Sequence, residues 1–469
     1  MHILIIGAGR IGRSVAENLV NESNDITIVD HDAERVNALE TRLDLRGVTG
    51  NALSPSVLES AGANDADMIL AVTANDETNM AVCLLASQLF NIPTRIARVR
   101  NQELRQYPRL LAEEGFQITS TIWPEQALNE SLLRLIEFPE ALQIIDFAEG
   151  KAVLFCVRAV AGSPLVGRPI GDLAVHLPYV PARIVSVFRR NRRLDISSET
   201  VIESGDEVIA LSSGRDVRRV ISELRQHEER IRRIMIAGNA RLGVQLAGLL
   251  NGPEGRRGYT ITILDEDTAL STSLAAAVPK DTELVTGSLT NEEVLTELCV
   301  DRCDLFISLS ARDENNIVGA LLAKKLGARR VIALTDSDTF SALMQGTQID
   351  VTVSSTQATI GELLRHVRRG DVLAAHSLRR GVAEALEIVA HGNKKSSRVV
   401  GKRIADIDLP EGVEIAALVR DTDDIEEPQV LIAQKDVIVE PEDRVIVFVP
   451  GKRVIAQVEK LFAVDVGFF

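Results

Sequence analysis

Aromatic residues are scarce in this chain of 469 residues: they make up 3% of it, with a single tryptophan and 3 tyrosines. Proteins that bind single-stranded nucleic acid commonly stack bases on aromatic side chains, so this scarcity argues against such a platform. The formal net charge of -15 would also repel a phosphate backbone at long range. We therefore expect no nucleic-acid partner.

Long apolar runs are also missing from the sequence. No stretch approaches the roughly 20 consecutive apolar residues that a membrane-spanning helix requires. The chain opens on an apolar run, Ile3 to Ile6, that leads directly into a glycine-rich segment. A secretory signal instead has a basic start, an apolar stretch and a cleavage site. We therefore expect a protein of the cytoplasm.

Cysteine is rare, with 4 residues in the whole chain. Cys299 and Cys303 are spaced C-x3-C, but no second cysteine or histidine pair lies nearby in the sequence. A structural zinc site needs four such ligands. The sequence therefore favours buried or idle thiols over a metal site.

What the chain does contain is an internal duplication. Gly7 corresponds to Gly238, and Asp30 in ITIVDHD corresponds to Asp265 in ITILDED. Further matching blocks begin, in the first and second copy, at residues 49 and 286, 165 and 399, and 204 and 441. Because the order of the matches is kept throughout, we infer two tandem copies of a unit of about 230 residues.

Each copy is predicted to have two parts. In the first part, strand-like runs alternate with helical patterns, which is typical of a parallel sheet covered on both faces by helices. Together with the glycine-rich turn, this predicts Rossmann-like α/β domains over residues 1–140 and 230–370. Short strands followed by an amphipathic helix predict small α+β domains over residues 141–225 and 371–469. In the first Rossmann-like domain, strands are expected at residues 2–6, 26–30, 68–73, 95–99 and 117–120.

The first glycine-rich segment has the spacing of a dinucleotide-binding loop. Gly7, Gly9 and Gly12 form G-x-G-x-x-G between a predicted strand and a predicted helix. In such a loop, the first glycine allows a tight turn, the second lets a pyrophosphate approach the backbone, and the third lets helix and strand pack. The N-terminus of the helix attracts phosphate, and Arg10 would add positive charge there. The alternative is a tight turn that holds no ligand.

Asp30 closes the second predicted strand, 23 residues after Gly7. A carboxylate at this point accepts hydrogen bonds from ribose hydroxyls and disfavours a 2′-phosphate, so NAD(H) is preferred to NADP(H). The same pocket suits the adenosine of ATP, ADP or an adenosyl compound. Arg98 and Arg100 follow a later strand, where they either reach phosphates or form an exposed surface pair.

The second copy has a modified loop. Gly238 and Gly243 remain, but Ala240 and Arg241 stand where a close-approach glycine is needed. Asp265 keeps the ribose partner. Our sequence alignment places Ala333 and Thr335 opposite Arg98 and Arg100, so phosphate neutralisation is lost. We expect weaker or altered nucleotide binding at this loop, or none.

No catalytic group accompanies these loops in the sequence. A dehydrogenase needs a proton donor or acceptor near the nicotinamide. Of the 7 histidines, only His31 follows a predicted Rossmann strand, and it lies next to the expected ribose position. Serine-hydrolase, zinc-protease and phosphate-loop lysine motifs are absent. We expect no enzyme; the alternative, an NAD-dependent oxidoreductase, lacks a residue to perform its acid–base step.

Taken together, ILIIGAGRIG, IVDHD, the block from Thr49 to Asn79, RVRN and SGDEVI resemble the RCK (KTN) domain over nearly the whole chain. The resemblance implies two RCK units, each with a nucleotide-binding N part and a small C part. It further implies a peripheral regulator on the cytoplasmic face of the plasma membrane. Such proteins form a ring, expected here as a homotetramer, beneath a potassium-translocating membrane subunit of the TrkH/TrkG kind. A soluble effector-binding protein without a membrane partner is the other alternative.

The resemblance also implies the ligands and their binding residues. NAD(H), with ATP or ADP as alternatives, would bind the Rossmann clefts, change the shape of the ring and so control the pore. The first site would comprise Gly7, Ala8, Gly9, Arg10, Ile11, Gly12, Asp30, Asn51, Ala52, Thr73, Ala74, Arg98 and Arg100. The second would comprise Gly238, Asn239, Ala240, Arg241, Leu242, Asp265 and Ser310.

Overall fold

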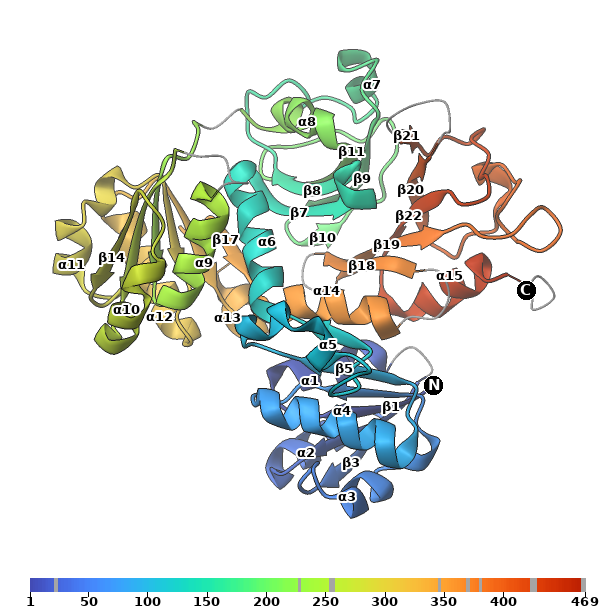
Figure 1. Cartoon of the computed structure of the whole chain (residues 1–469). Helices are drawn as coiled ribbons and strands as arrows, with labels where there is room; N and C mark the ends of the chain where they lie inside the picture. The colour runs from blue at the N-terminus through green and yellow to red at the C-terminus, as the bar shows by residue number, and fades with distance from the viewer. Residues whose placement is uncertain are drawn as a thin grey trace. The chain divides into compact units, whose positions relative to one another are not determined.

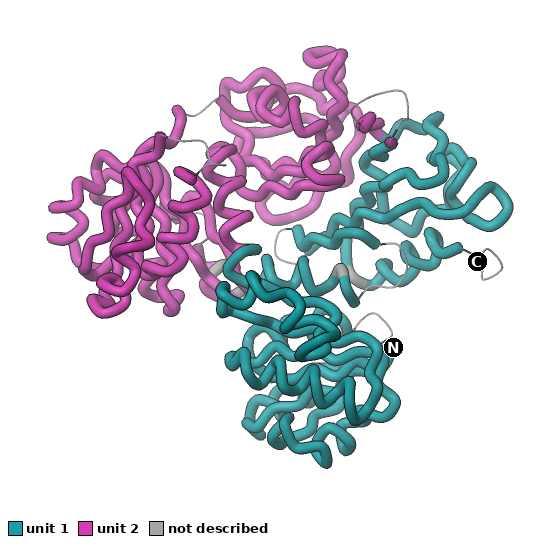
Figure 2. The backbone as a smooth tube through the Cα atoms, viewed as in Figure 1, with its two compact units in different colours: residues 1–127, 356–420, 433–469 teal, residues 128–355, 421–432 magenta. Residues whose placement is uncertain are grey.

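The computed structural model describes residues 1–20, 24–226, 229–252, 258–344, 347–367, 372–378, 382–421 and 428–464 (Figure 1). The chain divides into two compact units (Figure 2). Unit 1 comprises residues 1–127, 356–420 and 433–469, and unit 2 comprises residues 128–355 and 421–432. Among the described residues, no helix has the length and apolar character needed to cross a membrane.

Unit 1 contains a parallel sheet of six strands in the order β3-β2-β1-β4-β5-β6. The strands are β1 (His2–Ile6), β2 (Asp25–Asp30), β3 (Arg46–Thr49), β4 (Met68–Ala71), β5 (Thr94–Arg98) and β6 (Ser120–Ile122). The helices between them are α1 (Arg10–Leu19), α2 (Ala33–Glu40), α3 (Pro55–Ser60), α4 (Asp76–Phe90) and α5 (Pro108–Leu111). Apolar side chains of β1 and β4 are almost fully buried, as expected of central parallel strands.

Unit 2 contains the corresponding parallel sheet, in the order β14-β13-β12-β15-β16-β17. Its strands are β12 (Arg233–Ala237), β13 (Thr260–Asp265), β14 (Thr282–Thr286), β15 (Leu305–Ser308), β16 (Arg330–Leu334) and β17 (Val351–Val353). Its helices are α9 (Ala240–Asn251), α10 (Thr268–Leu274), α11 (Glu292–Glu297), α12 (Asp313–Lys325) and α13 (Asp338–Leu343). The repeated strand order and parallel pairing confirm the two predicted Rossmann-like folds.

Two helices contact a parallel sheet other than the one that their position in the sequence indicates. Helix α6 (Pro124–Glu137) follows the first sheet in the chain, yet Leu128, Leu132 and Leu135 pack in the core of the second sheet. Helix α14 (Ser355–Val367) follows the second sheet, yet a hydrogen bond of 2.9 Å joins its His366 to Ser120 in β6. Apolar residues spaced three and four apart form the stripe that α6 buries.

The small domains contain antiparallel sheets. In unit 2 the order is β10-β9-β11-β8-β7, and α8 packs its apolar face onto this sheet. Its elements are β7 (Ala141–Phe147), β8 (Ala152–Arg158), β9 (Ala182–Arg189), β10 (Arg192–Arg193), β11 (Glu207–Ser213), α7 (Asp172–His176) and α8 (Val217–Leu224). In unit 1 the order is β18-β19-β22-β20, with β18 (Val372–Leu378), β19 (Ala383–Val389), β20 (Glu414–Arg420), β22 (Arg444–Val449) and α15 (Ile455–Phe462). Residues 421–432, which belong to unit 2, contain β21 (Gln429–Ile432).

The duplication extends to individual ion pairs in these small domains. Arg189 donates to both carboxylate oxygens of Asp206 at 2.8 Å, and Arg420 does the same to Asp443 at 2.8 Å. Both aspartates are buried, at 1% exposure, so each fork-shaped guanidinium compensates a buried carboxylate. The common geometry confirms that the small domains are copies of one α+β fold.

Candidate functional site

The first glycine loop lies at the carboxyl end of β1, the third strand of the sheet. β1 pairs with β2 on one side and with β4 on the other, and the order of the strands reverses at this point. Ligands of doubly wound sheets bind in the crevice beyond the carboxyl ends of the strands at such a reversal. The fold therefore presents this loop where a nucleotide site is expected.

The three glycines of the loop have different physical roles. Gly7 has a φ of 107°, and a Cβ there would lie 3.2 Å from the backbone of Thr73. A Cβ on Gly12 would lie 1.8 Å from the carbonyl oxygen of Gly7, so α1 packs against the loop only without a side chain. No described atom lies within 4 Å of a Cβ built on Gly9. Gly9 therefore borders open space at the N-terminus of α1.

Asp30 supports the loop as well as facing it. Asp30 is 8% exposed, and its Oδ2 accepts a hydrogen bond from the Ala8 N–H at 2.6 Å. Its Oδ1 accepts from the Asp32 N–H at 2.9 Å and lies 3.1 Å from Nδ1 of His31. The sequence indicated a ribose partner; the structure adds that this carboxylate fastens the glycine loop to the end of β2.

A buried asparagine joins the ends of β4 and β5. Asn79 is fully buried, and its Oδ1 accepts from the N–H and hydroxyl of Thr73 at 2.9 and 2.7 Å. Its Nδ2 donates to the carbonyl of Arg98 at 2.9 Å. Asp76 accepts from the N–H of Arg100 at 2.9 Å. We predicted no role for Asn79 or Asp76 from the sequence, although both lie in the block from residue 49 that is repeated from residue 286.

The remaining residues of the first predicted site lie at the same edge of the sheet. Thr49 pairs with Asp30 at the end of β3, and exposed Asn51 follows two residues later. Ala52 is buried in the apolar core, whereas Ala74 is exposed beside Thr73. The fold therefore brings the carboxyl ends of five strands, with the residues proposed for them, to one edge.

The second loop has a different start to its helix. Helix α9 begins at Ala240, two residues after Gly238, and Asn239 caps it by accepting from the Leu242 N–H at 3.0 Å. In the first copy, α1 begins three residues after Gly7, and Gly9 has no side chain with which to cap it. Asp265 accepts from the N–H of Ala240 at 2.5 Å. The N-cap side chain of the second helix thus already accepts from a backbone N–H group that a bound phosphate would need.

The structure corrects our alignment of the two arginines. Asn79 binds the carbonyl of Arg98, and Asn316 binds that of Leu334 at 3.0 Å. Asp76 binds the N–H of Arg100, and Asp313 binds that of Asp336. Leu334 and Asp336 are therefore the equivalents of the two arginines. The residues that we expected, Ala333 and Thr335, each precede the true equivalent by one position. The error arose because the offset between the copies grows from 235 at Asp30 to 236 at Arg98.

The second site is consequently acidic where the first is basic. Asp336 replaces Arg100, and its two carboxylate oxygens accept hydrogen bonds from the hydroxyls of Ser354 and Ser355 at 2.8 Å each. Ser310 occupies the place of Thr73, with its N–H bound to Asn316 at 2.7 Å. Arg241 is exposed at the start of α9. This arrangement keeps the scaffold of the first site but reverses one of its charges.

The described residues hold no metal cluster, and two of the cysteines, Cys83 and Cys303, are buried and protonated. Among them, no group of three or more histidine, cysteine, aspartate or glutamate residues is placed to hold a metal ion. Burial raises the pKa of the Cys83 thiol to about 12, and burial likewise raises the pKa of Cys303 to about 12. These thiols are protonated at neutral pH, whereas the reactive form of cysteine is the thiolate.

Comparison with known proteins identifies both parts of each copy. Residues 3–117 and 234–355 match the TrkA-N domain, and residues 154–225 and 394–463 match the TrkA-C domain. The chain is 45% identical over 469 residues to the Trk system potassium uptake protein TrkA of Halomonas elongata, with 100% of both chains covered. It is 42% identical over 463 residues to the protein of the same name from Vibrio alginolyticus, with 98% of both covered.

Solved structures share the fold at low sequence identity. The GsuK RCK domain superimposes with a TM-score of 0.58 at 19% identity, covering 98% of this chain and 94% of that one. A GsuK channel bound to NAD gives a TM-score of 0.58 at 18% identity, covering 98% and 78%. The relatives are named as potassium uptake proteins and not as enzymes, in agreement with our expectation. From its sequence and its tandem domains, this chain belongs to the TrkA family of Trk system potassium uptake proteins.

Proposed function

We propose that this chain is the regulatory subunit of a Trk potassium uptake system and that a nucleotide bound at the first glycine loop controls it. The single observation that carries the proposal is the open space beside Gly9 at the N-terminus of α1. Helix N-termini attract phosphate through their N–H groups and their dipole. Gly9 and Gly7 here fit the positions at which a pyrophosphate would pass along the backbone.

NAD(H) is the ligand that we propose, with ATP and ADP as alternatives for the same site. Asp30 lies at the end of β2, where a ribose would sit, and Arg98 and Arg100 lie at the end of β5, where further phosphates would be neutralised. A GsuK channel with the same fold is described as bound to NAD. For the other residues that we assigned to the two sites from the sequence, a contact with the nucleotide remains a prediction.

The second loop is proposed to bind nucleotide weakly or not at all. Asn239 already occupies the Leu242 N–H, and buried Ala240 replaces the glycine that borders open space in the first copy. Asp336 stands where Arg100 stands in the first copy and would repel a phosphate. The two copies therefore have distinct roles: the first senses a ligand, and the second retains the fold.

Control of transport would follow from a shift between conformations. A ligand shifts such an equilibrium only if it binds one state more tightly than the other. We propose that the chain forms a ring, as a homotetramer, on the cytoplasmic face of the plasma membrane beneath a TrkH/TrkG-like potassium-translocating subunit. We also propose that the chain consists of four domains, at residues 1–140, 141–225, 230–370 and 371–469.

The direct test is calorimetric titration of the purified chain with NADH, ATP and ADP. Gly9→Val is the sharpest variant, because its backbone is extended, with φ of -69° and ψ of -171°, and accepts a branched side chain. Its side chain would fill the space that the pyrophosphate needs. Gly248→Val is the matched control, since no described atom lies within 4 Å of a Cβ at that position in α9.

We expect Gly9→Val to weaken binding of the active nucleotide by about a hundredfold or more, since it removes the close phosphate contacts. Gly248→Val should bind as the parent does. Equal affinities in all three proteins would contradict the assignment of the site. Coupling to transport is then measured as potassium flux through vesicles containing the membrane subunit, with and without nucleotide.

A further inference from the structure

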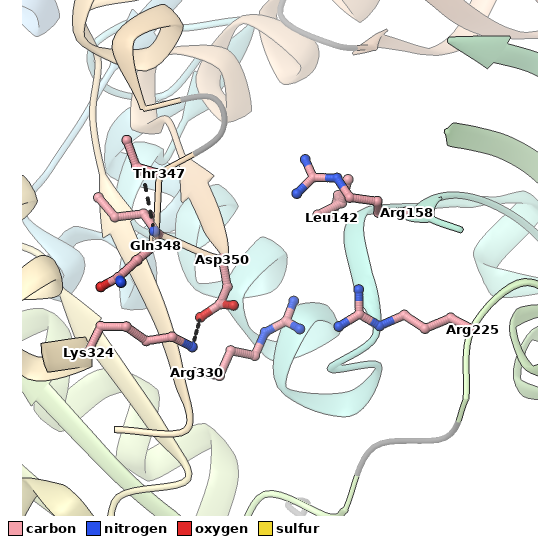
Figure 3. Close-up of a pocket in the computed structure, with 9 residues that line it drawn as sticks. Leu142, Arg158, Arg225, Lys324, Arg330, Thr347, Gln348 and Asp350 are labelled. Carbon is pink, nitrogen blue, oxygen red and sulfur yellow. Dashed lines mark hydrogen bonds and ion pairs between the residues drawn. The ribbon is translucent and has the colours of Figure 1, made fainter. Parts of the chain in front are cut away.

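Unit 2 contains a cavity of about 330 Å³ whose lining includes four basic residues, Arg158, Arg225, Lys324 and Arg330 (Figure 3). Two of these have acidic partners: Nζ of Lys324 lies 2.8 Å from Oδ2 of Asp350, and Arg158 pairs with Glu207 at 3.0 Å. Arg330 donates to the carbonyl of Ala141 at 2.8 Å. Contacts within the protein therefore already engage all four side chains.

A histidine at the first glycine loop, by contrast, is largely open to solvent. His31 directly follows β2, its side chain is 85% exposed, and its Nδ1 lies 3.1 Å from Oδ1 of Asp30. Asp30 is the residue that we propose as the ribose partner, and NADP(H) differs from NAD(H) by a phosphate on that ribose. Under the proposed function, His31 therefore lies beside the one group that distinguishes the two dinucleotides.

Backbone N–H groups hold the Asp30 carboxylate in place. Its Oδ2 accepts from Ala8 at 2.6 Å, and its Oδ1 accepts from Asp32 at 2.9 Å. Beside a neutral imidazole, this carboxylate keeps its negative charge and repels a 2′-phosphate. An imidazolium has N–H donors on both ring nitrogens, so it can compensate the carboxylate and donate to a phosphate oxygen.

The charged residues of the neighbouring elements are few. Arg10 is exposed at the start of α1, and Asp32, Glu34 and Arg35 lie at the start of α2. Nε of Arg35 lies 3.0 Å from Oδ2 of Asp32, whose Oδ1 caps the helix. The residues just after β3 carry no charge. Histidine is the side chain that ordinarily changes charge between about pH 5 and 8, so His31 is the group here that pH can switch.

The second copy shows that the fold does not require a histidine at this position. In both copies, the N–H two residues after the aspartate that ends the strand donates to its Oδ1 at 2.9 Å. This shared contact places Glu266 opposite His31. Since the same turn forms with an acidic residue, the histidine is a feature of the first copy alone.

We propose that His31 is a specificity-determining residue, which lets the first glycine loop accept NADP(H) when its imidazole is protonated. The inference rests on the proposed nucleotide site and deepens it. With a neutral imidazole, the Asp30 carboxylate governs the ribose end and NAD(H) is preferred. With an imidazolium, the 2′-phosphate gains a donor and loses a repulsion, so the preference for NAD(H) relaxes as the pH falls.

The test is calorimetric titration of the full chain with NADH and NADPH at about pH 6 and about pH 8. The two ligands differ only in the 2′-phosphate, so the ratio of their affinities isolates this end of the site. We expect the affinity for NADPH relative to NADH to rise about fivefold or more from the higher to the lower pH. His31→Arg should give a high ratio at both pH values, and His31→Glu, the residue of the second copy, a low one.

Two further variants serve as controls. The 2′-phosphate itself takes up a proton near pH 6, and His31→Gln reports this contribution because its side chain cannot become charged. Its ratio should change by less than about twofold. His391→Gln removes another histidine–carboxylate pair, in which Nδ1 lies 2.7 Å from Glu442 in the small domain of unit 1, and should respond to pH as the parent does.

The outcomes separate this inference from the site on which it rests. If NADH binds but the ratio changes as much in His31→Gln as in the parent, or stays low in His31→Arg, the role of His31 is overturned and the nucleotide site remains. If the parent binds NADH at neither pH, the nucleotide site and the role of His31 are overturned together.

Discussion

The carboxylate of Asp30 accepts a hydrogen bond from the N–H of Ala8 at 2.6 Å, and thereby ties the glycine loop to the end of β2. In the second copy Asp265 makes a comparable tie one residue further along the loop, to the N–H of Ala240 at 2.5 Å. This second hydrogen bond is present although an asparagine caps the helix that follows it and the neighbouring site carries an aspartate in place of an arginine. Each aspartate therefore has a structural role in its own loop.

Replacing these aspartates is expected to affect stability in both copies but binding in one. Asp30→Ala removes two backbone contacts to a buried carboxylate and should lower the free energy of unfolding by about 2–4 kcal/mol. Asp265→Ala should cost a similar amount. Urea denaturation measures the loss, and nucleotide titration should show weaker binding only for Asp30→Ala. Weaker binding in the Asp265 variant would mean that the second loop also holds nucleotide.

The glycines of the first loop should tolerate alanine very differently. Gly12→Ala places a Cβ against the backbone oxygen of Gly7 and should destabilise the protein by about 3 kcal/mol or more. Gly9→Ala meets open space and should cost less than about 1 kcal/mol. Thermal unfolding of the two variants compares these losses. Similar melting temperatures would show that the loop is packed differently from the structure described.

Arg100 is expected to distinguish the possible ligands. Arg100→Ala should weaken ATP binding by about tenfold, and NADH binding less, because ATP carries more phosphate charge. Arg100→Asp installs the residue of the second copy and should weaken ATP binding further. Titrations at two salt concentrations should show the ATP effect shrinking as salt rises. Identical losses for both nucleotides would remove Arg100 from the phosphate contacts.

The paired asparagines allow a test of positioning. Asn79→Ala breaks four hydrogen bonds of a fully buried side chain and should cost about 3 kcal/mol of stability. It should also weaken nucleotide binding, since Thr73 and Arg98 lose their support. Asn316→Ala removes three hydrogen bonds in the second copy, without the hydroxyl bond that Thr73 adds in the first, and should cost similar stability without affecting binding. Denaturation and titration together separate the two effects.

Thiol reactivity provides a test of the core packing. Cys83, Cys156 and Cys303 are buried, and Cys299 is exposed. The pKa values of Cys83 and Cys303, each raised to about 12 by burial, keep both thiols protonated at pH 8. A colorimetric thiol reagent at pH 8 should therefore modify Cys299 rapidly and the other three only after unfolding. Rapid reaction of a second thiol in the native protein would show that one of these cores opens.

The outline of the fold could be predicted from the sequence because its signals are local. Strands β1, β2, β4 and β5 agree with the predicted ranges to within two residues at either end, since buried parallel strands are continuous apolar runs. Strand β3 was missed, because this short outer strand has no fully buried residue. Strand β6 begins at Ser120, where the predicted strand ended.

The sequence by itself determined the duplication, the fold class and the position of the first glycine loop. Each depends on residue spacing that the backbone geometry of one turn or one strand requires. Only the tertiary structure decided that α6 packs in the core of the second sheet, that Asp336 rather than Thr335 opposes Arg100, and that four distant basic residues share one cavity. Packing between distant segments depends on shape and register, which hydrophobic periodicity does not encode.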